Sequence, residues 1–342
     1  MIRSLISRRD FIKIAGFLTG PSFFWGNKKY AAGSSDKNDT TYPSYLKLYE
    51  SGELKQRADQ LYAFYECCEL CPRDCRVSRT QNQLGKCQAS NKVKVSNAFP
   101  HYGEEIPLVG KRGSGTVFFS NCGLRCVYCQ NYTISIEGEG VEIPDRRLAE
   151  TMIKVQNMGC HNINLVTPTH YLPNIINALN LAVPMGLKIP LVYNTGGYEK
   201  ADILKLLDGV IDIYMPDCKY MDPENAAKFS SEAYNYPYYV KGALKEMFRQ
   251  VGDISLDPKG IARRGLLIRH LVLPNRAAGT REFLQFVADE LTKTTYMNIM
   301  RQYRPEYKAK EYPEINRRIT SKEYSEAIAW AKELGFNRLD RG

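Results

Sequence analysis

The amino-acid sequence predicts an α/β fold, an open partial barrel built from six βα units. Three observations lead to this prediction. Short runs rich in Val, Ile and Leu alternate with longer segments of helical spacing from residue 116 onward. Such continuous apolar runs fit strands that are buried on both faces, as in parallel sheets. No glycine-rich dinucleotide fingerprint follows the first run, which disfavours a doubly wound nucleotide-binding sheet.

The predicted strands and helices follow one another in regular order. Strands are expected at residues 116–120, 162–167, 189–194, 211–215, 265–273 and 295–300. Helices are expected at residues 146–158, 172–185, 199–207, 281–291 and 321–334. Because a closed barrel of this kind needs eight strands, six predict an open partial barrel, placed in a domain of residues 111–342 with a C-terminal helix.

The composition is that of an ordinary globular protein, with 44% hydrophobic and 25% charged residues. The net charge of +10 does not indicate nucleic-acid binding, because residues 1–30 carry six basic residues and one acidic residue and so supply half of it. The other basic residues are scattered among acidic ones instead of forming a stripe with aromatic stacking partners. We therefore expect no nucleic-acid partner.

Residues 1–33 resemble a twin-arginine export signal. The paired Arg8 and Arg9 are followed by Phe11 and Lys13, and then by an apolar stretch that is too short for a stable membrane span. Small residues follow this stretch, as a cleavage site requires. A basic amphipathic tail is the alternative interpretation of the same residues.

Residues 34–110 are predicted to contain a polar linker, a helix over residues 43–65 and a small cysteine-rich metal-binding domain. Four thiols fall within twenty residues, and Cys67 is a spare thiol beside the first. This spacing indicates metal ligation, because disulfides between such near neighbours would strain the backbone. It fits tetrahedral zinc as well as an auxiliary iron–sulfur cluster. The predicted ligands are Cys68, Cys71, Cys75 and Cys87.

A second cysteine set, Cys122, Cys126 and Cys129, follows the first predicted strand directly. This loop would lie at the carboxyl end of the strand, where α/β barrels place their active sites. Three thiolates leave one iron of a four-iron cluster open, whereas an electron-transfer cluster usually takes four cysteines. A zinc site completed by a distant fourth ligand is the alternative. The remaining cysteines, Cys160 and Cys218, are predicted to be small buried hydrophobes.

The spacing of three and two residues between these cysteines, with the aromatic Tyr128 before the last one, resembles the signature of the radical S-adenosylmethionine (SAM) superfamily. The resemblance implies that the open iron of a [4Fe-4S] cluster holds the amino and carboxylate groups of SAM. It implies reductive cleavage of SAM to a 5′-deoxyadenosyl radical, which abstracts hydrogen from a substrate, and an electron donor as a partner. Iron is then preferred over zinc at the upstream cysteines.

Further stretches resemble one family within this superfamily, the pyruvate formate-lyase activating enzyme-like proteins. They are residues 112–120, 162–170, 194–199, 212–217 and 269–274. The resemblance implies that residues 167–169 occupy the place of a Gly-Gly-Glu motif that receives the amino group of SAM, and this chain lacks that glutamate. A helix cap or a surface ion pair is the alternative for each polar residue that follows a strand. The SAM-binding residues that the resemblance implies are Tyr128, Thr167, Thr169, Asn194, Asp217, Lys219 and Arg269.

Three functions are compatible with these features. The first is an activating enzyme that takes a hydrogen atom from the Cα of a glycine in a partner protein and leaves a stored glycyl radical. The second directs the same chemistry at a small molecule or at another protein modification, because fold and cluster do not choose the substrate. The third is a non-catalytic exported iron–sulfur or metal-binding protein. The signal segment predicts the periplasm and SAM chemistry predicts the cytoplasm, so the compartment stays open.

Overall fold

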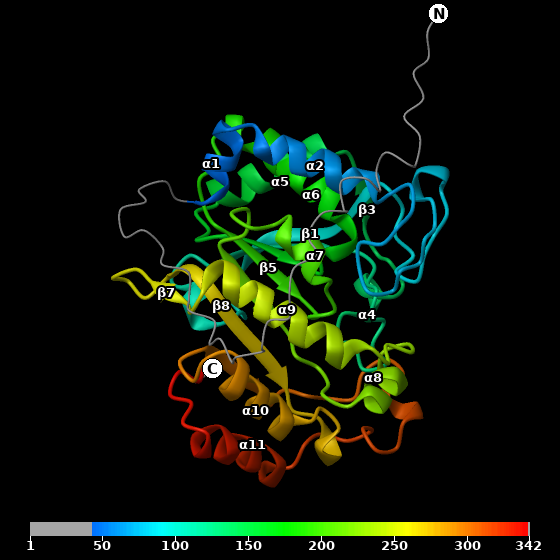
Figure 1. Cartoon of the computed structure of the whole chain (residues 1–342), viewed down its shortest axis with the longest axis vertical. Coiled ribbons are helices and arrows are strands. Elements are labelled where there is room, and N and C mark those ends of the chain that lie inside the picture. The colour runs from blue at the N-terminus through cyan, green and yellow to red at the C-terminus, as the bar shows by residue number, and fades with distance from the viewer. Residues whose placement is uncertain (1–42, 341–342) are drawn as a thin grey trace, which may run out of the picture. The chain divides into compact units, whose positions relative to one another are not determined.

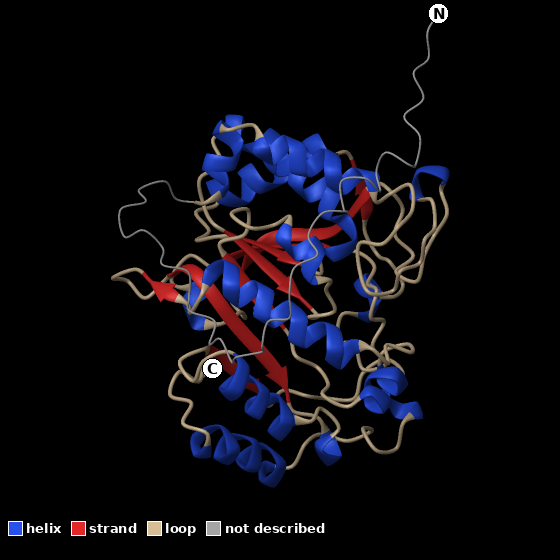
Figure 2. Cartoon of the chain, viewed as in Figure 1, coloured by secondary structure: helices blue, strands red, loops and turns tan. Residues whose placement is uncertain are grey.

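A central sheet of nine strands organises the part of the chain that the structure describes (Figures 1 and 2). The computed structural model describes residues 43–340, and the predicted signal segment lies outside them. The strands are ordered β3-β1-β2-β4-β5-β6-β8-β7, and β9 also pairs with β8. The described residues belong to one compact unit. A separate cysteine-rich domain that ends at residue 110 therefore stays a prediction.

Six strands of this sheet run parallel, and each overlaps one of the six predicted ranges. Nearly every residue in the central ones is buried, as expected for strands covered on both faces. The mixed α/β class with a central sheet is thus confirmed, whereas the closure into a partial barrel stays a prediction. These strands are β2 (Ser114–Phe119), β4 (Ile163–Val166), β5 (Leu191–Thr195), β6 (Ile213–Pro216), β8 (Ala262–Leu271) and β9 (Tyr296–Met300).

Helices form where the apolar spacing predicts them. In α5 (Asp145–Asn157) the buried residues Leu148, Met152 and Val155 recur at helical spacing and so share one face. In α11 (Ser321–Glu333) a capping box of Thr320 and Glu323 satisfies the first free amides. The other predicted helices are α6 (Leu172–Ala182), α7 (Ala201–Lys205) and α10 (Thr280–Glu290), and the lead-in region forms α1 (Tyr45–Glu50) and α2 (Glu53–Ala63).

Several elements are not foreseen from the sequence pattern. The strand β1 (Val93–His101) pairs antiparallel with β2, and it is only partly buried and contains a proline, so it lacks the apolar run typical of the other strands. The long helix α9 (Tyr236–Val251) packs on α7, β6 and β8. The remaining elements are α3 (Ile106–Val109), α4 (Tyr132–Ser135), α8 (Pro223–Phe229), β3 (Val141–Ile143) and β7 (Ser255–Leu256).

The parallel register brings several predicted site residues to one edge of the sheet. Asn194 lies beside Val166 at the carboxyl ends of β5 and β4. Asp217, directly after β6, bridges to Arg269 in β8. The turn after β5 requires glycine at position 197. Gly197 has φ +77°, and a Cβ atom on any other residue here would lie only 2.2 Å from the carbonyl oxygen of Asp217.

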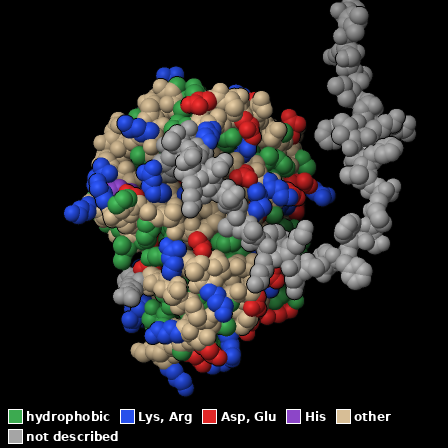
Figure 3. Space-filling view, turned by 60° about the vertical axis from the view of Figure 1, so that its left-hand side comes forward, with side chains coloured by type: hydrophobic (Ala, Val, Ile, Leu, Met, Phe, Trp, Pro, Cys, Tyr) green, Lys and Arg blue, Asp and Glu red, His purple; other side chains and the backbone are tan. Residues whose placement is uncertain are grey.

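The helices cover the sheet in distinct groups (Figure 1). The helix α6 packs against both α2 and α5, and α10 packs against α11. Between residues 43 and 340 no helix is long and apolar enough to cross a membrane. On the face drawn in Figure 3, Lys and Arg side chains are interspersed with acidic and apolar ones and do not form a continuous basic stripe.

Candidate functional site

A cavity of about 420 Å³ lies at the carboxyl ends of the parallel strands. A second hollow of about 640 Å³ contains none of the residues predicted for the cluster or for SAM. All ten of those residues line the smaller cavity, so the structure brings them together, although their roles as ligands stay predictions. They are Cys122, Cys126, Cys129, Tyr128, Thr167, Thr169, Asn194, Asp217, Lys219 and Arg269.

The three cysteines occupy a loop between β2 and α4, and each sulfur has a polar neighbour. The Ser230 hydroxyl donates a 3.0 Å hydrogen bond to the Cys126 Sγ. The Cys129 Sγ lies 3.0 Å from the Ser135 hydroxyl, and the Cys122 Sγ accepts a 3.4 Å bond from the Leu124 amide. Burial raises the pKa of the Cys126 thiol to about 12, although Lys219 acts in the opposite direction.

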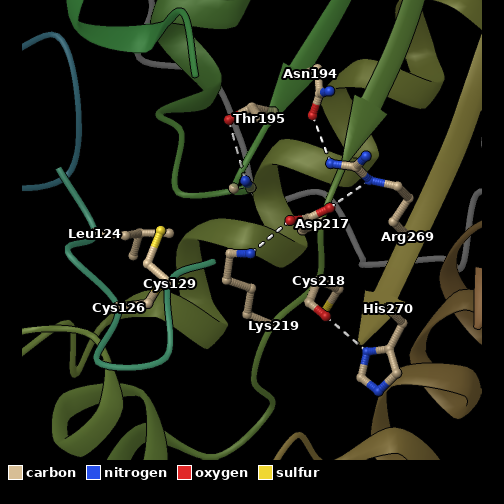
Figure 4. Close-up of polar contacts among 12 residues, drawn as sticks. Leu124, Cys126, Cys129, Asn194, Thr195, Asp217, Cys218, Lys219, Arg269 and His270 are labelled. Atoms are coloured by element: carbon tan, nitrogen blue, oxygen red, sulfur yellow. Dashed lines mark hydrogen bonds and ion pairs between the residues drawn. The ribbon is translucent and has the colours of Figure 1, made fainter. Parts of the chain in front are cut away.

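A chain of charged and polar side chains faces this loop across the cavity (Figure 4). Asp217 accepts a 2.6 Å bond from the Lys219 Nζ and a 2.7 Å bond from the Arg269 Nε. Arg269 also donates to the Asn194 Oδ1 over 2.7 Å and pairs with Glu104 over 3.3 Å. Burial favours a higher pKa for Asp217, but Arg269 and Lys219 outweigh it and hold this pKa below its usual value. The network fixes two cations at the cavity wall.

A buried carboxylate, Glu199, reaches the same cavity from the loop after β5. Its Oε1 accepts hydrogen bonds from the hydroxyls of Thr169, at 2.6 Å, and Thr195. Among the described residues its Oε2 has no hydrogen-bond partner. Burial raises the pKa of Glu199 to about 7, although the two threonine hydroxyls and the nearby Tyr193 hydroxyl lower it. A buried carboxylate oxygen in this state fits a cationic group of a ligand.

The remaining predicted SAM contacts are held by the backbone and by aromatic packing. Thr167 has φ +57°, and its amide donates a 2.8 Å bond to the Asn194 carbonyl, which fixes the turn after β4. The Tyr128 ring is buried and packs edge-on against Tyr220 and Tyr303. These residues therefore shape the cavity wall.

The upstream cysteines adjoin this cavity. Cys71 and Cys87 line it, whereas Cys68 and Cys75 do not. Burial raises the pKa of the Cys71 and Cys87 thiols. Neighbouring thiols, Cys68 among them, raise the pKa of both further. The buried Arg79 guanidinium lowers the pKa of Cys87, and so favours its thiolate.

The donor chemistry of the cavity loop fits a cluster held by three thiolates. In such a cluster each thiolate binds a different iron, and hydrogen bonds to the sulfurs tune the potential. All three thiols line one cavity, and polar groups adjoin each sulfur. Over residues 43–340, no three His, Cys, Asp or Glu side chains form a group that could hold a single metal ion, so the three cavity thiols fit a cluster with one thiolate on each of three irons and not a mononuclear site.

Sequence reasoning missed two residues that the structure brings to the site. Glu199 lies in a stretch noted for its family resemblance, but the expected glutamate belonged to the loop after β4 and not after β5. Ser230 contacts Cys126 from the segment between α8 and α9, two helices that the sequence interpretation did not include. No spacing rule connects either residue to the cysteines, because packing of the fold brings each of them to the cavity.

Comparison with known proteins identifies the superfamily of the chain. Residues 116–251 match the Radical SAM superfamily. The chain is also 30% identical, over 324 residues, to the Uncharacterized protein MJ0674 of Methanocaldococcus jannaschii, and the match covers 91% of this chain and 86% of that protein. The chain therefore belongs to the radical SAM superfamily, which implies a [4Fe-4S] cluster and the cleavage of SAM by radical chemistry.

Proposed function

We propose that the protein holds a [4Fe-4S] cluster on Cys122, Cys126 and Cys129, cleaves SAM beside it, and takes a hydrogen atom from a glycine of a partner protein. Superfamily membership supports the cluster and SAM. The resemblance to pyruvate formate-lyase activating enzyme-like proteins supports the glycyl-radical product. An external electron donor supplies the electron that SAM cleavage consumes.

The chain's own residues bind and orient SAM in this proposal. Glu199 offers its free Oε2 to the N–H donors of the SAM amino group, in place of the missing glutamate. Lys219 and Arg269 present positive charge to the SAM carboxylate, while Asn194 and Asp217 offer oxygens to the ribose hydroxyls. When bound, the cluster and SAM together supply the hydrogen-abstracting radical. Tyr128, Thr167 and Thr169 complete the wall and exclude water.

The volume of the cavity is the observation that carries the choice of a protein substrate. Small-molecule sites span roughly 300–1,000 Å³, and the cavity of about 420 Å³ lies near the lower end. Because the same cavity must accept SAM, little volume is left for a second small molecule. A glycine in an extended loop needs only its Cα at the reacting position. An open partial barrel would let such a loop enter.

The test is electron paramagnetic resonance on the reduced, cluster-loaded protein incubated with SAM and a candidate glycyl-radical partner. The proposal predicts a doublet from the coupling of the unpaired electron to the remaining Cα hydrogen. A partner with that glycine changed to alanine should give no doublet. Turnover of a small molecule, with no doublet from any glycyl-radical partner, would instead support the second functional hypothesis.

We further propose that Cys68, Cys71, Cys75 and Cys87 bind an auxiliary iron–sulfur cluster, with zinc as the alternative metal. The buried Arg79 supports this proposal, because a thiolate-rich site carries negative charge that a nearby cation offsets. Counting iron and zinc after anaerobic purification decides between the two. About eight irons per chain indicate two clusters, whereas about four irons with one zinc indicate the alternative.

The compartment stays open, because the twin-arginine-like segment supports export of the folded, cluster-loaded chain to the periplasm, whereas SAM chemistry supports the cytoplasm. Cell fractionation of the full chain, beside a variant with Arg8→Lys and Arg9→Lys, tests this proposal. Cluster-loaded protein in the periplasm only when both arginines are present would support export, and an unchanged distribution would contradict it.

A further inference from the structure

Arg73, in the upstream cysteine segment, is hydrogen-bonded into the loop that carries the cavity cysteines. Its Nε donates to the Gly123 carbonyl over 2.8 Å, and its Nη2 donates to the Leu124 carbonyl over 3.4 Å. Both carbonyls lie between Cys122 and Cys126. The two cysteine sets, separate in the sequence, are therefore joined through one side chain.

The same guanidinium also holds the segment that contacts the Cys126 thiol. Its Nη1 donates to the Ser231 carbonyl over 2.7 Å, and its Nη2 donates to the Ser230 carbonyl over 2.8 Å. Ser230 is the residue whose hydroxyl donates to the Cys126 Sγ. Arg73 therefore fixes the backbone on both sides of this sulfur.

An arginine side chain is needed to reach all four carbonyl groups, and these neutral groups do not neutralise its positive charge. A guanidinium has five donors in a rigid planar fork, whereas a lysine ammonium cannot reach four acceptors at these separate positions. Among the described residues Arg73 forms no ion pair with a carboxylate, and the Tyr198 ring lies 5.3 Å from its central carbon. An unneutralised positive charge thus lies beside the cysteine loop.

A second contact runs in the opposite direction, from the cavity loop to the upstream segment. The Asn121 Nδ2 donates to the Cys87 carbonyl over 3.1 Å and to the Gln88 carbonyl over 2.9 Å. Asn121 directly precedes Cys122 and has φ +74°. An ion pair of Asp74 with Lys200 ties the upstream segment to the loop after β5.

We propose that Arg73 is a positioning residue that couples the upstream cysteine segment to the cluster loop. It sets the geometry of the loop through four hydrogen bonds, and its charge favours the more negative, reduced form of the bound cluster. This inference rests on the proposed cluster at Cys122, Cys126 and Cys129. It does not depend on which metal the upstream thiols bind.

The test compares Arg73→Lys and Arg73→Ala with a control in the same segment. Arg76→Ala serves as the control, because the Arg76 side chain is 73% exposed and, within residues 43–340, pairs only with Glu69. Hydrogen exchange of the metal-free full chain should become faster at residues 121–126 and 230–231 in both Arg73 variants, and stay unchanged in the control. With the cluster loaded, Arg73→Ala should lower the midpoint potential, whereas Arg73→Lys retains the charge and alters mainly the spectrum.

We expect the loss of loop geometry to lower kcat/KM for SAM cleavage at least about tenfold in both variants, as small misplacements of reacting groups do. Exchange rates, potential and spectrum that match those of Arg76→Ala would overturn the inference. If Arg73→Ala fails to fold, Arg73→Lys decides alone. A wild-type chain that binds no cluster would contradict the proposed function instead, and hydrogen exchange would still report on Arg73.

Discussion

The Thr169 hydroxyl donates a 2.6 Å hydrogen bond to Glu199. This bond joins the ends of two neighbouring strands, because Thr169 follows β4 and Glu199 follows β5. The family resemblance places a SAM-binding glutamate in the loop after β4, where this chain has threonine. We infer that the chain supplies the carboxylate from the next strand, and that Thr169 orients it.

The stability of the metal-free chain should depend on pH through Glu199. Its pKa of about 7 in the folded chain lies above the usual value of 4.5, so the folded state binds this proton more tightly than the unfolded state. The resulting stabilisation is complete below about pH 4.5 and is lost as the pH rises through 7, a difference of about 3 kcal/mol. Denaturant unfolding at pH 5 and pH 8 should show this loss in wild type.

Two variants isolate the contribution of Glu199 to that pH dependence. Glu199→Gln keeps the acceptor for Thr169 but cannot ionise, so it should be more stable than wild type at pH 8 by about 1–3 kcal/mol. Glu232→Gln is the matched control, because the Glu232 side chain is 88% exposed. An equal loss of stability between pH 5 and pH 8 in wild type and Glu199→Gln would assign the effect to other groups.

The affinity of the cluster-loaded protein for SAM should increase as the pH rises from 6 to 8. The SAM amino group donates hydrogen bonds and so prefers an ionised Glu199, whose pKa of about 7 lies within this interval. Equilibrium binding should therefore strengthen up to about tenfold over these two pH units, with most of the change below pH 7. In Glu199→Gln, affinity should be low and the same at both pH values. A variant that keeps the wild-type pH profile would exclude Glu199 from the binding site.

Removing the charge of Asp217 should destabilise the chain strongly. Asp217→Asn leaves the part-buried cations Lys219 and Arg269, whose side chains are 18% and 16% exposed, without their shared carboxylate. Breaking a fully buried pair costs roughly 3–5 kcal/mol, and we expect a cost near the lower end of this range here. The exposed pair of Lys205 with Asp202 provides the control, since Asp202→Asn should change the free energy of unfolding by less than about 0.5 kcal/mol. If both variants lost a similar amount of unfolding free energy, the Asp217 network would stabilise the chain no more than a surface ion pair does.

Substitution of neighbouring cysteines should show which upstream thiols bind metal. Cys87→Ser should lose the upstream metal and retain the iron at the cavity loop. Cys67→Ser should retain both, because Cys67 is exposed and lies outside the predicted ligand set, whereas Cys87 is buried and belongs to that set. Metal analysis of the two variants beside wild type provides the measurement. Loss of upstream metal in Cys67→Ser, with none in Cys87→Ser, would reverse the assignment.

Local signals in the sequence are sufficient to predict the parallel part of the fold. The strands β4, β5 and β6 are short apolar runs that follow one another through helices, and parallel pairing brings their carboxyl ends to one edge. Thr167, Asn194 and Asp217 could therefore be placed at one cavity from their positions after these strands. The strand β1 escaped prediction because it is half-exposed and pairs antiparallel.

Contacts made across the fold could not be predicted. Arg73 reaches the cysteine loop through backbone carbonyls, which every residue has, so no side-chain pattern indicates the contact. Glu199 lies five residues beyond Asn194, and its burial depends on how the turn at Gly197 packs against Asp217. Such contacts depend on packing, and local sequence carries no signal for them.

The release of 5′-deoxyadenosine tests the central claim most directly. The wild-type chain, purified anaerobically, reduced with dithionite and supplied with SAM, should release it. Cys126→Ala should bind less iron and release none, whereas Cys160→Ala, which changes a buried cysteine outside both sets, should behave as wild type. No 5′-deoxyadenosine from the cluster-loaded wild type, or equal release by Cys126→Ala, would contradict the assignment of the cluster to this loop.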